Sequence, residues 1–451
     1  MRIALTAPLF AWDCLEDSPS LQTIRRFLHA LPDDKLLDSL RRARGKGRND
    51  YPVHVLWGVV VLTVLLRHTS FEACLGELRR NEALRRLIGI ESEEKVPKKW
   101  NISRFLNLLG QEPHRSLLKE VFDTMIRRLG SVVPDLGREL AGDATSLHAR
   151  RAAGAAAETA AAEDLPEPAL GHKEYCDETG KVTRIMEWFG YKLHLLVDVK
   201  HEVAVAYAIT SPTADDGQTL PVTLAEAQSN LPPGRIRTLV YDKAADSYEV
   251  HALLHQKHIK PVIQNRSLWK EQSEQMLPGH DGRSNIVYDE AGTVYCYDRV
   301  SVPMVRHRMA YIGYEPRRQT IKYRCPARHE GWSCPSDALC NGGKRYGKTV
   351  RVKQSIDLRR FPPIPRATRR FERLYKGRSA VERVIGRLKV FWGADDGNIR
   401  GGCRFFAFVG VVMVVHAGLA TVLASLPRWD GTLGQMNLSP IAKKLQALLR
   451  G

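Results

Sequence analysis

The pattern of hydrophobic and polar positions changes twice along the chain. Between residues 20 and 130, apolar residues recur at mixed spacings of three and four, with arginines on the other faces, as in LQTIRRFLHALP and FEACLGELRRNEALRRLIGI. Such spacing is typical of amphipathic helices. It predicts an all-α N-terminal domain over residues 1–130. Its arginines either serve DNA binding or dimerisation, or simply face solvent on a helical bundle.

Residues 135–265 follow a different rhythm. The stretches FGYKLHLLVDV (189–199) and EVAVAYAIT (202–210) predict a hairpin of two strands. Beyond them helices and strands alternate, with a helix at 216–231, a strand at 235–244 that ends at Asp242, a helix at 247–257 and a strand at 259–265. This order predicts a mixed sheet covered by helices. The alanine-rich stretch 151–164 predicts a linker or surface excursion.

The second change comes at residues 266–365, which are rich in Tyr, Arg, Gly and Pro and contain short β-like pieces. They predict a β-rich, cysteine-containing insertion. A strong helix then begins near Phe371 and opens the second part of the core, residues 366–430, followed by a C-terminal tail at 431–451. The expected fold class is therefore mixed α/β.

One segment, Phe405–Leu426, is long enough to span a bilayer and carries no formal charge. A fully buried core helix is also apolar all round. We favour the buried helix because a charged helix precedes it directly, but a C-terminal membrane anchor remains an alternative. At the N-terminus Asp13 and Glu16 follow a short apolar stretch, which predicts no secretory signal and a cytoplasmic, nucleoid-associated protein.

Composition narrows the class of partner. With 43% hydrophobic and 26% charged residues, the chain fits neither a disordered protein nor a multi-span membrane protein. Its 68 Lys and Arg against 50 Asp and Glu give a net charge of +18, which favours a polyanionic partner such as nucleic acid. Eight cysteines are too few for a disulfide framework.

Candidate chemistry concentrates in FERLYKGRSAVERVIGRLKVFWG, residues 371–393. On a regular helix of about 100° per residue, one stripe about 60° wide would carry Tyr375, Arg378, Glu382 and Lys389. Other basic side chains of the segment would point to solvent or to a phosphate backbone. The simplest interpretation is an amphipathic helix with solvated charges. In that case Glu382 is an ion-pair partner of Arg378; a metal-ligand role is the alternative.

The spacing Y-x2-R-x3-E-x6-K in this helix resembles the signature of bacterial insertion-sequence transposases that carry a DDE triad. The family places one Asp on a central strand in a G-D-x-T-like context, matched by Asp143 in LAGDATSLHAR, and a second at the end of a later strand, matched by Asp242 in TLVYDKAADS. Ala244 and Ala245 depart from the family pattern, which commonly has Gly and an aromatic residue there. Asp215 and Asp246 are nearby acids that could be mistaken for the second Asp.

The resemblance implies a ribonuclease H-like core in which Asp143, Asp242 and Glu382 hold two Mg²⁺ or Mn²⁺ ions for DNA cleavage and strand transfer. It implies double-stranded DNA as partner, at the terminal inverted repeats of the element and at target DNA, a homodimer on DNA, and no nucleotide triphosphate or membrane. The residues expected to contact DNA are Tyr375, Arg378, Lys389, Arg383 and Arg387. The rival hypothesis is a catalytically inactive, transposase-derived DNA-binding protein.

The insertion carries four cysteines, Cys296, Cys325, Cys334 and Cys340, with His329 nearby. Four of these five groups could bind zinc tetrahedrally. The spacings lack the C-x2-C pattern of a zinc knuckle, so a set of reduced thiols remains the alternative.

Overall fold

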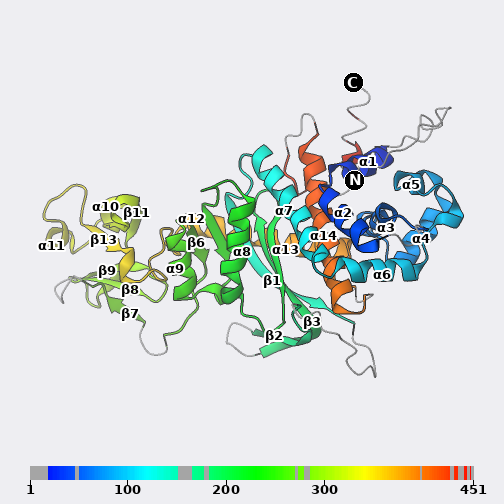
Figure 1. Ribbon diagram of the computed structural model, residues 1–451. Coiled ribbons are helices and arrows are strands. Elements are labelled where there is room, and N and C mark those ends of the chain that lie inside the picture. The colour runs from blue at the N-terminus through cyan, green and yellow to red at the C-terminus, as the bar shows by residue number, and fades with distance from the viewer. Residues whose placement is uncertain are drawn as a thin grey trace.

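The computed structural model describes residues 19–45, 50–150, 165–176, 182–269, 273–278, 285–396, 399–426, 431–434, 441–443 and 447. The molecule is elongated, with the insertion at one end, a central sheet in the middle and the N-terminal helices at the other end (Figure 1). The predicted linker at 151–164, the N-terminal stretch with Asp13 and Glu16, and most of the tail at 431–451 lie outside the described residues.

The N-terminal region is helical, as predicted. Its helices are α1 (Pro19–Ala30), α2 (Asp34–Arg44), α3 (Val53–Leu65), α4 (Phe71–Arg80), α5 (Glu82–Leu87), α6 (Lys99–Leu109) and α7 (His114–Val132). The Ser70 hydroxyl and the Asn81 amide oxygen cap α4 and α5 by accepting backbone N–H groups, which explains why these helices begin there. Helix α3 is apolar on every side and is accordingly buried.

The central sheet consists of β1 (Glu139–His148), β2 (Ala169–Cys176), β3 (Val182–Asp198), β4 (Ala204–Thr210), β5 (Thr238–Tyr241) and β6 (Lys260–Ile263). Its order is β2-β3-β1-β5-β6, with β4 paired to β3. Strand β1 runs antiparallel to β3 and parallel to β5, and β5 runs parallel to β6. The sheet is therefore mixed, and the predicted hairpin is the antiparallel pair of β3 and β4.

Helices α8 (Asp216–Asn230), α9 (Tyr248–Gln256), α12 (Arg369–Tyr375), α13 (Ser379–Gly386) and α14 (Gly402–Ala424) complete this part. Helix α13 packs on β1 and β3, and α8 packs on β3 and β4. The segment after Phe371 is not the regular helix that we expected. A 3₁₀ turn (Lys376–Arg378) separates α12 from α13, and a π-helix (Arg387–Phe391) follows α13.

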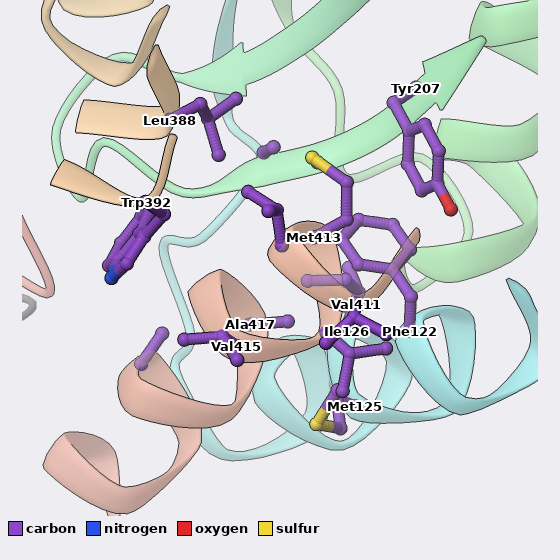
Figure 2. Close-up of a cluster of buried hydrophobic side chains, with 14 of the residues drawn as sticks. Phe122, Met125, Ile126, Tyr207, Leu388, Trp392, Val411, Met413, Val415 and Ala417 are labelled. Carbon is purple, nitrogen blue, oxygen red and sulfur yellow. The ribbon is translucent and has the colours of Figure 1, made fainter. Parts of the chain in front are cut away.

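The apolar segment is the buried helix α14. Within its most apolar window, which has the length and composition of a membrane span, 83% of the residues are buried in the protein. Figure 2 shows α14 packed between α7, which contributes Phe122 and Ile126, and the helical segment that carries Trp392. Its histidine, His416, is fully buried and accepts a hydrogen bond of 2.9 Å from the Ala204 backbone N–H. A polar side chain with a protein partner fits a core helix better than a lipid-facing one.

The insertion holds β7 (Glu274–Met276), β8 (Ile286–Asp289), β9 (Val294–Asp298) and β10 (Val305–Arg308) in one sheet, and β11 (Ala310–Glu315), β12 (Thr320–Arg324) and β13 (Thr349–Lys353) in another. The short helices α10 (Pro326–Glu330) and α11 (Asp337–Asn341) lie between β12 and β13 in the chain. The insertion has a small hydrophobic core of its own. By contrast, the N-terminal helices, the central sheet and α14 share a single core.

Candidate active site

Two of the three predicted acids lie on adjacent strands. Asp143 stands in the middle of β1, and Asp242 follows β5 directly. Because β1 and β5 are paired in parallel, the two carboxylates emerge on neighbouring strands. Gly142 makes this arrangement possible. A Cβ at that position would lie 2.2 Å from the Tyr241 ring, so only glycine lets the ring pack over β1.

The third acid, Glu382, lies in the first turn of α13 and is brought to β1 by Arg378. The Arg378 guanidinium bridges two carboxylates that are far apart in the chain: its Nη1 lies 3.2 Å from Asp143 Oδ2 and its Nη2 lies 2.6 Å from Glu382 Oε1. The charges of Asp242 and Asp143 also act on the Tyr375 hydroxyl, as do those of Arg378 and Glu382. The three predicted acids thus lie near one another, around the Arg378 guanidinium and the Tyr375 hydroxyl.

The Asp143 side chain is only 16% exposed, against 51% for Glu382. Burial raises the pKa of Asp143, and the neighbouring carboxylate of Asp242 raises it further. The backbone N–H of Ala144 and the charge of Arg378 oppose this rise. A carboxylate in this setting favours a nearby cation, because positive charge offsets the loss of hydration.

Asp242 also has a local structural task. Its Oδ1 accepts a hydrogen bond of 2.9 Å from the Ala244 N–H and caps the short 3₁₀ turn Lys243–Ala245. Ala244 and Ala245 stand where the resembling family commonly has Gly and an aromatic residue, and here they form this turn. Capping occupies one oxygen and leaves the second available to a ligand.

Tyr375 stacks on Phe371, with ring centroids 5.8 Å apart and planes inclined by 8°. Burial raises the pKa of its hydroxyl. This stacking favours the packing role over that of a platform for an unpaired base, although the half-buried ring still borders the acids.

The expected stripe does not extend to Lys389. The π-helix after α13 breaks the regular rotation, and the Lys389 ammonium lies 2.9 Å from Asp395 Oδ2 and 3.4 Å from Ser146 Oγ. Ser146 is three residues beyond Asp143 on β1, so it belongs to the opposite face of that strand. Lys389 is therefore not part of the Arg378 bridge.

Arg383 and Arg387 were expected to face solvent or phosphate, and for Arg387 that expectation is wrong. Both arginines pair with Glu202 in the turn between β3 and β4, at 2.6 and 2.8 Å. The Arg387 side chain is only 13% exposed and also donates to the Gly434 carbonyl. Arg387 therefore holds the helical segment to the sheet, whereas Arg383 is half exposed.

Sequence reasoning missed a second charged group, which lies on the face of the sheet opposite Asp143. Lys192 on β3 lies 2.6 Å from Asp216 Oδ1 at the start of α8, and His194 lies 3.4 Å from the same oxygen. Asp216 and Asp143 both act on the buried Tyr241 hydroxyl, whose pKa is raised first by burial and then by these acids. The available signal was Lys192 and His194 at alternate positions of one strand, which places both on one face.

The two decoy acids have structural partners. Asp215 caps α8, accepting from the Gln218 N–H at 3.1 Å. Asp246 is fully buried and is paired with Arg359 and Arg366, at 2.9 and 2.8 Å, and with His251 at 3.0 Å. Asp242 is therefore the acid of this loop that remains open to a ligand.

The donor set suits a hard divalent cation, since all three groups are carboxylates. One cation, the Arg378 guanidinium, already joins Asp143 and Glu382, so these carboxylates converge on positive charge. Within the described residues, no three His, Cys, Asp or Glu groups stand in ligating geometry. Arg378 would have to release at least one carboxylate before an ion could be held by all three.

Comparison with known proteins gives a family. A family model described as a transposase DDE domain matches residues 136–416, and one described as a transposase domain (DUF772) matches residues 13–108. None of the curated proteins matches the chain. A solved piggyBac transposase synaptic complex with hairpin DNA is similar at 10% identity, over 98% of this chain and 84% of that one, with a TM-score of 0.37. A similarity of this size supports no inference about fold or function.

Proposed function

The chain belongs to the transposase DDE-domain family, and from that premise we propose that it is an active DNA transposase. It binds the terminal inverted repeats of its own element, cleaves DNA there and transfers the strand. The observation that carries the proposal is the Arg378 bridge. Residues 143 and 382 lie at opposite ends of the family match, yet their carboxylates meet on one guanidinium beside Asp242.

Asp143, Asp242 and Glu382 are the residues that would hold Mg²⁺ or Mn²⁺. When bound, two such ions stabilise the charge on the attacking and leaving oxygens of an in-line displacement at phosphorus. The protein supplies fixed carboxylates from two paired strands, while Glu382 comes from a helix that packs on them. Burial of Asp143 disfavours its charged form in the absence of a cation, so binding positive charge there relieves an unfavourable state.

Arg378 then takes a second role. Once it is released from Asp143 or Glu382, its planar guanidinium can bind a DNA phosphate with two parallel hydrogen bonds. Arg383 is exposed enough to contact the DNA backbone beside Arg378, whereas Lys389, six residues further along the chain, would first have to leave Asp395. Tyr375 keeps α12 packed through Phe371 and so positions Arg378. The net charge of +18 supports sequence-independent attraction to the DNA backbone.

In the strand order β4-β3-β1-β5-β6, β3 alone runs opposite to the other strands, and this arrangement supports a ribonuclease H-like core. The residues Tyr375, Arg378, Glu382 and Lys389 support the signature group named above. We further propose that the enzyme works in the bacterial cytoplasm on nucleoid DNA as a homodimer, because two element ends are cut together.

The test uses DNA that carries the inverted repeats flanking the reading frame, incubated with the full chain and Mg²⁺ or Mn²⁺. Cleavage at the repeat ends is expected, and joining to target DNA should follow. Asp143→Asn and Glu382→Gln should remove cleavage but not binding. Asp215→Asn is the matched control: it changes a nearby acid, and asparagine caps a helix as well as aspartate does.

One observation favours the second candidate, an inactive DNA-binding protein. In the described part of the chain, Arg378 already neutralises two of the acids, and no three groups stand ready for a metal. This candidate predicts specific binding to the repeats without cleavage under any metal condition. Activity that disappears in Asp143→Asn but persists in Asp215→Asn would exclude it.

A further inference from the structure

The four cysteines of the insertion, which come from different places in the chain, line one enclosed cavity. Cys296 lies on β9, Cys325 follows β12, Cys334 lies in the loop after α10, and Cys340 lies on α11. The cavity measures about 20 Å³, which is room for one water-sized guest. None of the four forms a disulfide. The fold thus brings together cysteines that are widely separated in the sequence.

The thiols lie close enough to influence one another. The pKa of Cys296 is raised to about 12, first by burial and then by the neighbouring Cys325, Cys334 and Cys340. The pKa of Cys334 is also raised, by burial and by Asp298, Cys325 and Cys340.

Hydrogen-bond donors already point at two of the sulfur atoms. The Asn341 amide N–H lies 3.6 Å from Cys325 Sγ, and the Asn285 amide N–H lies 3.6 Å from Cys340 Sγ. The Lys348 ammonium donates to Asn285 Oδ1 at 3.2 Å and places a positive charge near Cys296. Donors and a cation around thiolates are the surroundings that a metal–sulfur site needs to offset its negative charge.

Two histidines are near the cysteines, but only one of them lines the cavity. His329, the fifth group considered from the sequence, is exposed on α10 and does not line the cavity. His307 on β10 does line it, and it pairs with Cys296 in the β9–β10 ladder. His307 is therefore the alternative fourth ligand, whereas His329 is not placed to be one.

We propose that the insertion holds one structural zinc ion, bound by Cys296, Cys325, Cys334 and Cys340. Sulfur ligands select zinc over hard cations such as Mg²⁺. Each thiol that binds exchanges its S–H bond for a Zn–S bond and releases its proton to solvent, with no change in oxidation state. The insertion has a small hydrophobic core, and a metal that links β9, β12 and α11 would stabilise it.

Binding requires a small rearrangement. Among the described residues, no three Cys, His, Asp or Glu groups already stand in ligating geometry, so the sulfur atoms must move closer together to bind an ion. The cavity between them provides the space for that movement.

The test is the metal content of the full chain, expressed with zinc in the medium and purified under reducing conditions without chelator. We expect about one zinc per chain by mass spectrometry of the metals, and loss of that zinc in Cys325→Ser and in Cys340→Ser. Cys403→Ser, outside the insertion, is the matched control and should retain the ion. Wild-type protein without stoichiometric zinc would overturn the proposal.

A second measurement keeps the proposal testable if the serine variants do not fold. Wild-type protein grown with Co²⁺ in place of zinc should show the absorption of tetrahedral cobalt with sulfur-to-cobalt charge transfer, and titration with an organomercurial should release the metal as thiols are consumed. His307→Ala should leave the cobalt spectrum unchanged if all four ligands are sulfur. Absence of the thiolate bands, or disulfides among these cysteines in the reduced protein, would contradict it.

Discussion

Two clusters of acidic and arginine side chains form on either side of the short turn after β5. They differ in how completely the acid is paired. In the first, Asp143 and Glu382 share Arg378 beside Asp242. In the second, which we call the junction cluster, Asp246 is surrounded by Arg359, Arg366 and His251 and receives the Arg266 N–H as well. Asp242 and Asp246 are only four residues apart in the chain.

The difference lies in exposure and in the balance of charge. Asp246 is fully buried, both its oxygens have donors, and the arginines beside it are less than 10% exposed. In the first cluster three acids face one arginine, and Glu382 is half exposed. A fully paired acid joins the insertion to the core, whereas a cluster with excess negative charge and open oxygens is prepared for a cationic ligand.

The largest effect should come from the first cluster. Asp143→Asn and Glu382→Gln each remove a carboxylate that would hold the ions, at a loss of several kcal/mol of transition-state stabilisation. The DNA cleavage rate should therefore fall by on the order of 10³-fold. Gel-based cleavage assays with end-bearing DNA measure this. A rate within a few-fold of wild type would remove the residue from the site.

The junction cluster should respond in stability instead. Asp246→Ala leaves two buried arginines unpaired and should lower the free energy of unfolding by about 3–5 kcal/mol at pH 7. Chemical denaturation followed by circular dichroism measures the loss. A fall of less than about 1 kcal/mol would contradict the structural role.

The stability that Asp246 contributes should depend on pH in a defined direction. Burial alone would raise the pKa of Asp246. The hydrogen bond from His251, the charge of Arg366, the Arg266 N–H and Arg359 outweigh it and lower the pKa from 3.8 to about 2. A depressed folded-state pKa means that the stabilisation is present above pH 3.8 and is lost as the pH falls toward 2. The difference in free energy of unfolding between wild type and Asp246→Ala should therefore shrink as the pH falls from 3.8 toward 2.

Asp215 allows a smaller test of the same contrast, because it lies near the acids but is satisfied as a helix cap. Asp215→Ala should lower the free energy of unfolding by about 1 kcal/mol through loss of the cap on α8. Cleavage by the folded variant should stay near the wild-type rate. A large loss of cleavage with unchanged stability would instead move Asp215 into the active site.

The smallest expected effect is on Mn²⁺ affinity, because Arg378 competes with the metal ion for the carboxylates of Asp143 and Glu382. Arg378→Ala should tighten Mn²⁺ binding in the absence of DNA by about two- to fivefold, since a partly exposed ion pair contributes about 0.2–1 kcal/mol. Electron paramagnetic resonance of free Mn²⁺ measures the affinity. Arg383→Ala removes the same charge from a neighbouring site and should not tighten binding. Weaker binding in Arg378→Ala would show that Arg378 orients the carboxylates rather than competing for them.

Much of the local structure could be predicted from the sequence. Patterns with periods set by backbone geometry predicted the helical N-terminal region, the hairpin before α8, the strand that leads to Asp242 and the buried apolar helix. Asp143 and Asp242 were candidates only through the resemblance to the family's two Asp motifs, because an Asp near a strand end is by itself often a turn or cap residue. Lys192 and His194 were missed because two polar positions in an apolar strand are too short a pattern to reveal Asp216, which belongs to another element.

The sequence by itself thus determined which elements form, because hydrophobic periodicity acts within one helix or strand, and its resemblance to a family supplied the candidate acids. Only the tertiary structure decided which acids are open and which are paired. Arg387 and Asp246 became structural, and Arg378 came to bridge Asp143 and Glu382, through contacts between residues more than one hundred positions apart. Such pairings depend on how the elements pack against one another, and the spacing of residues within one element does not predict that packing.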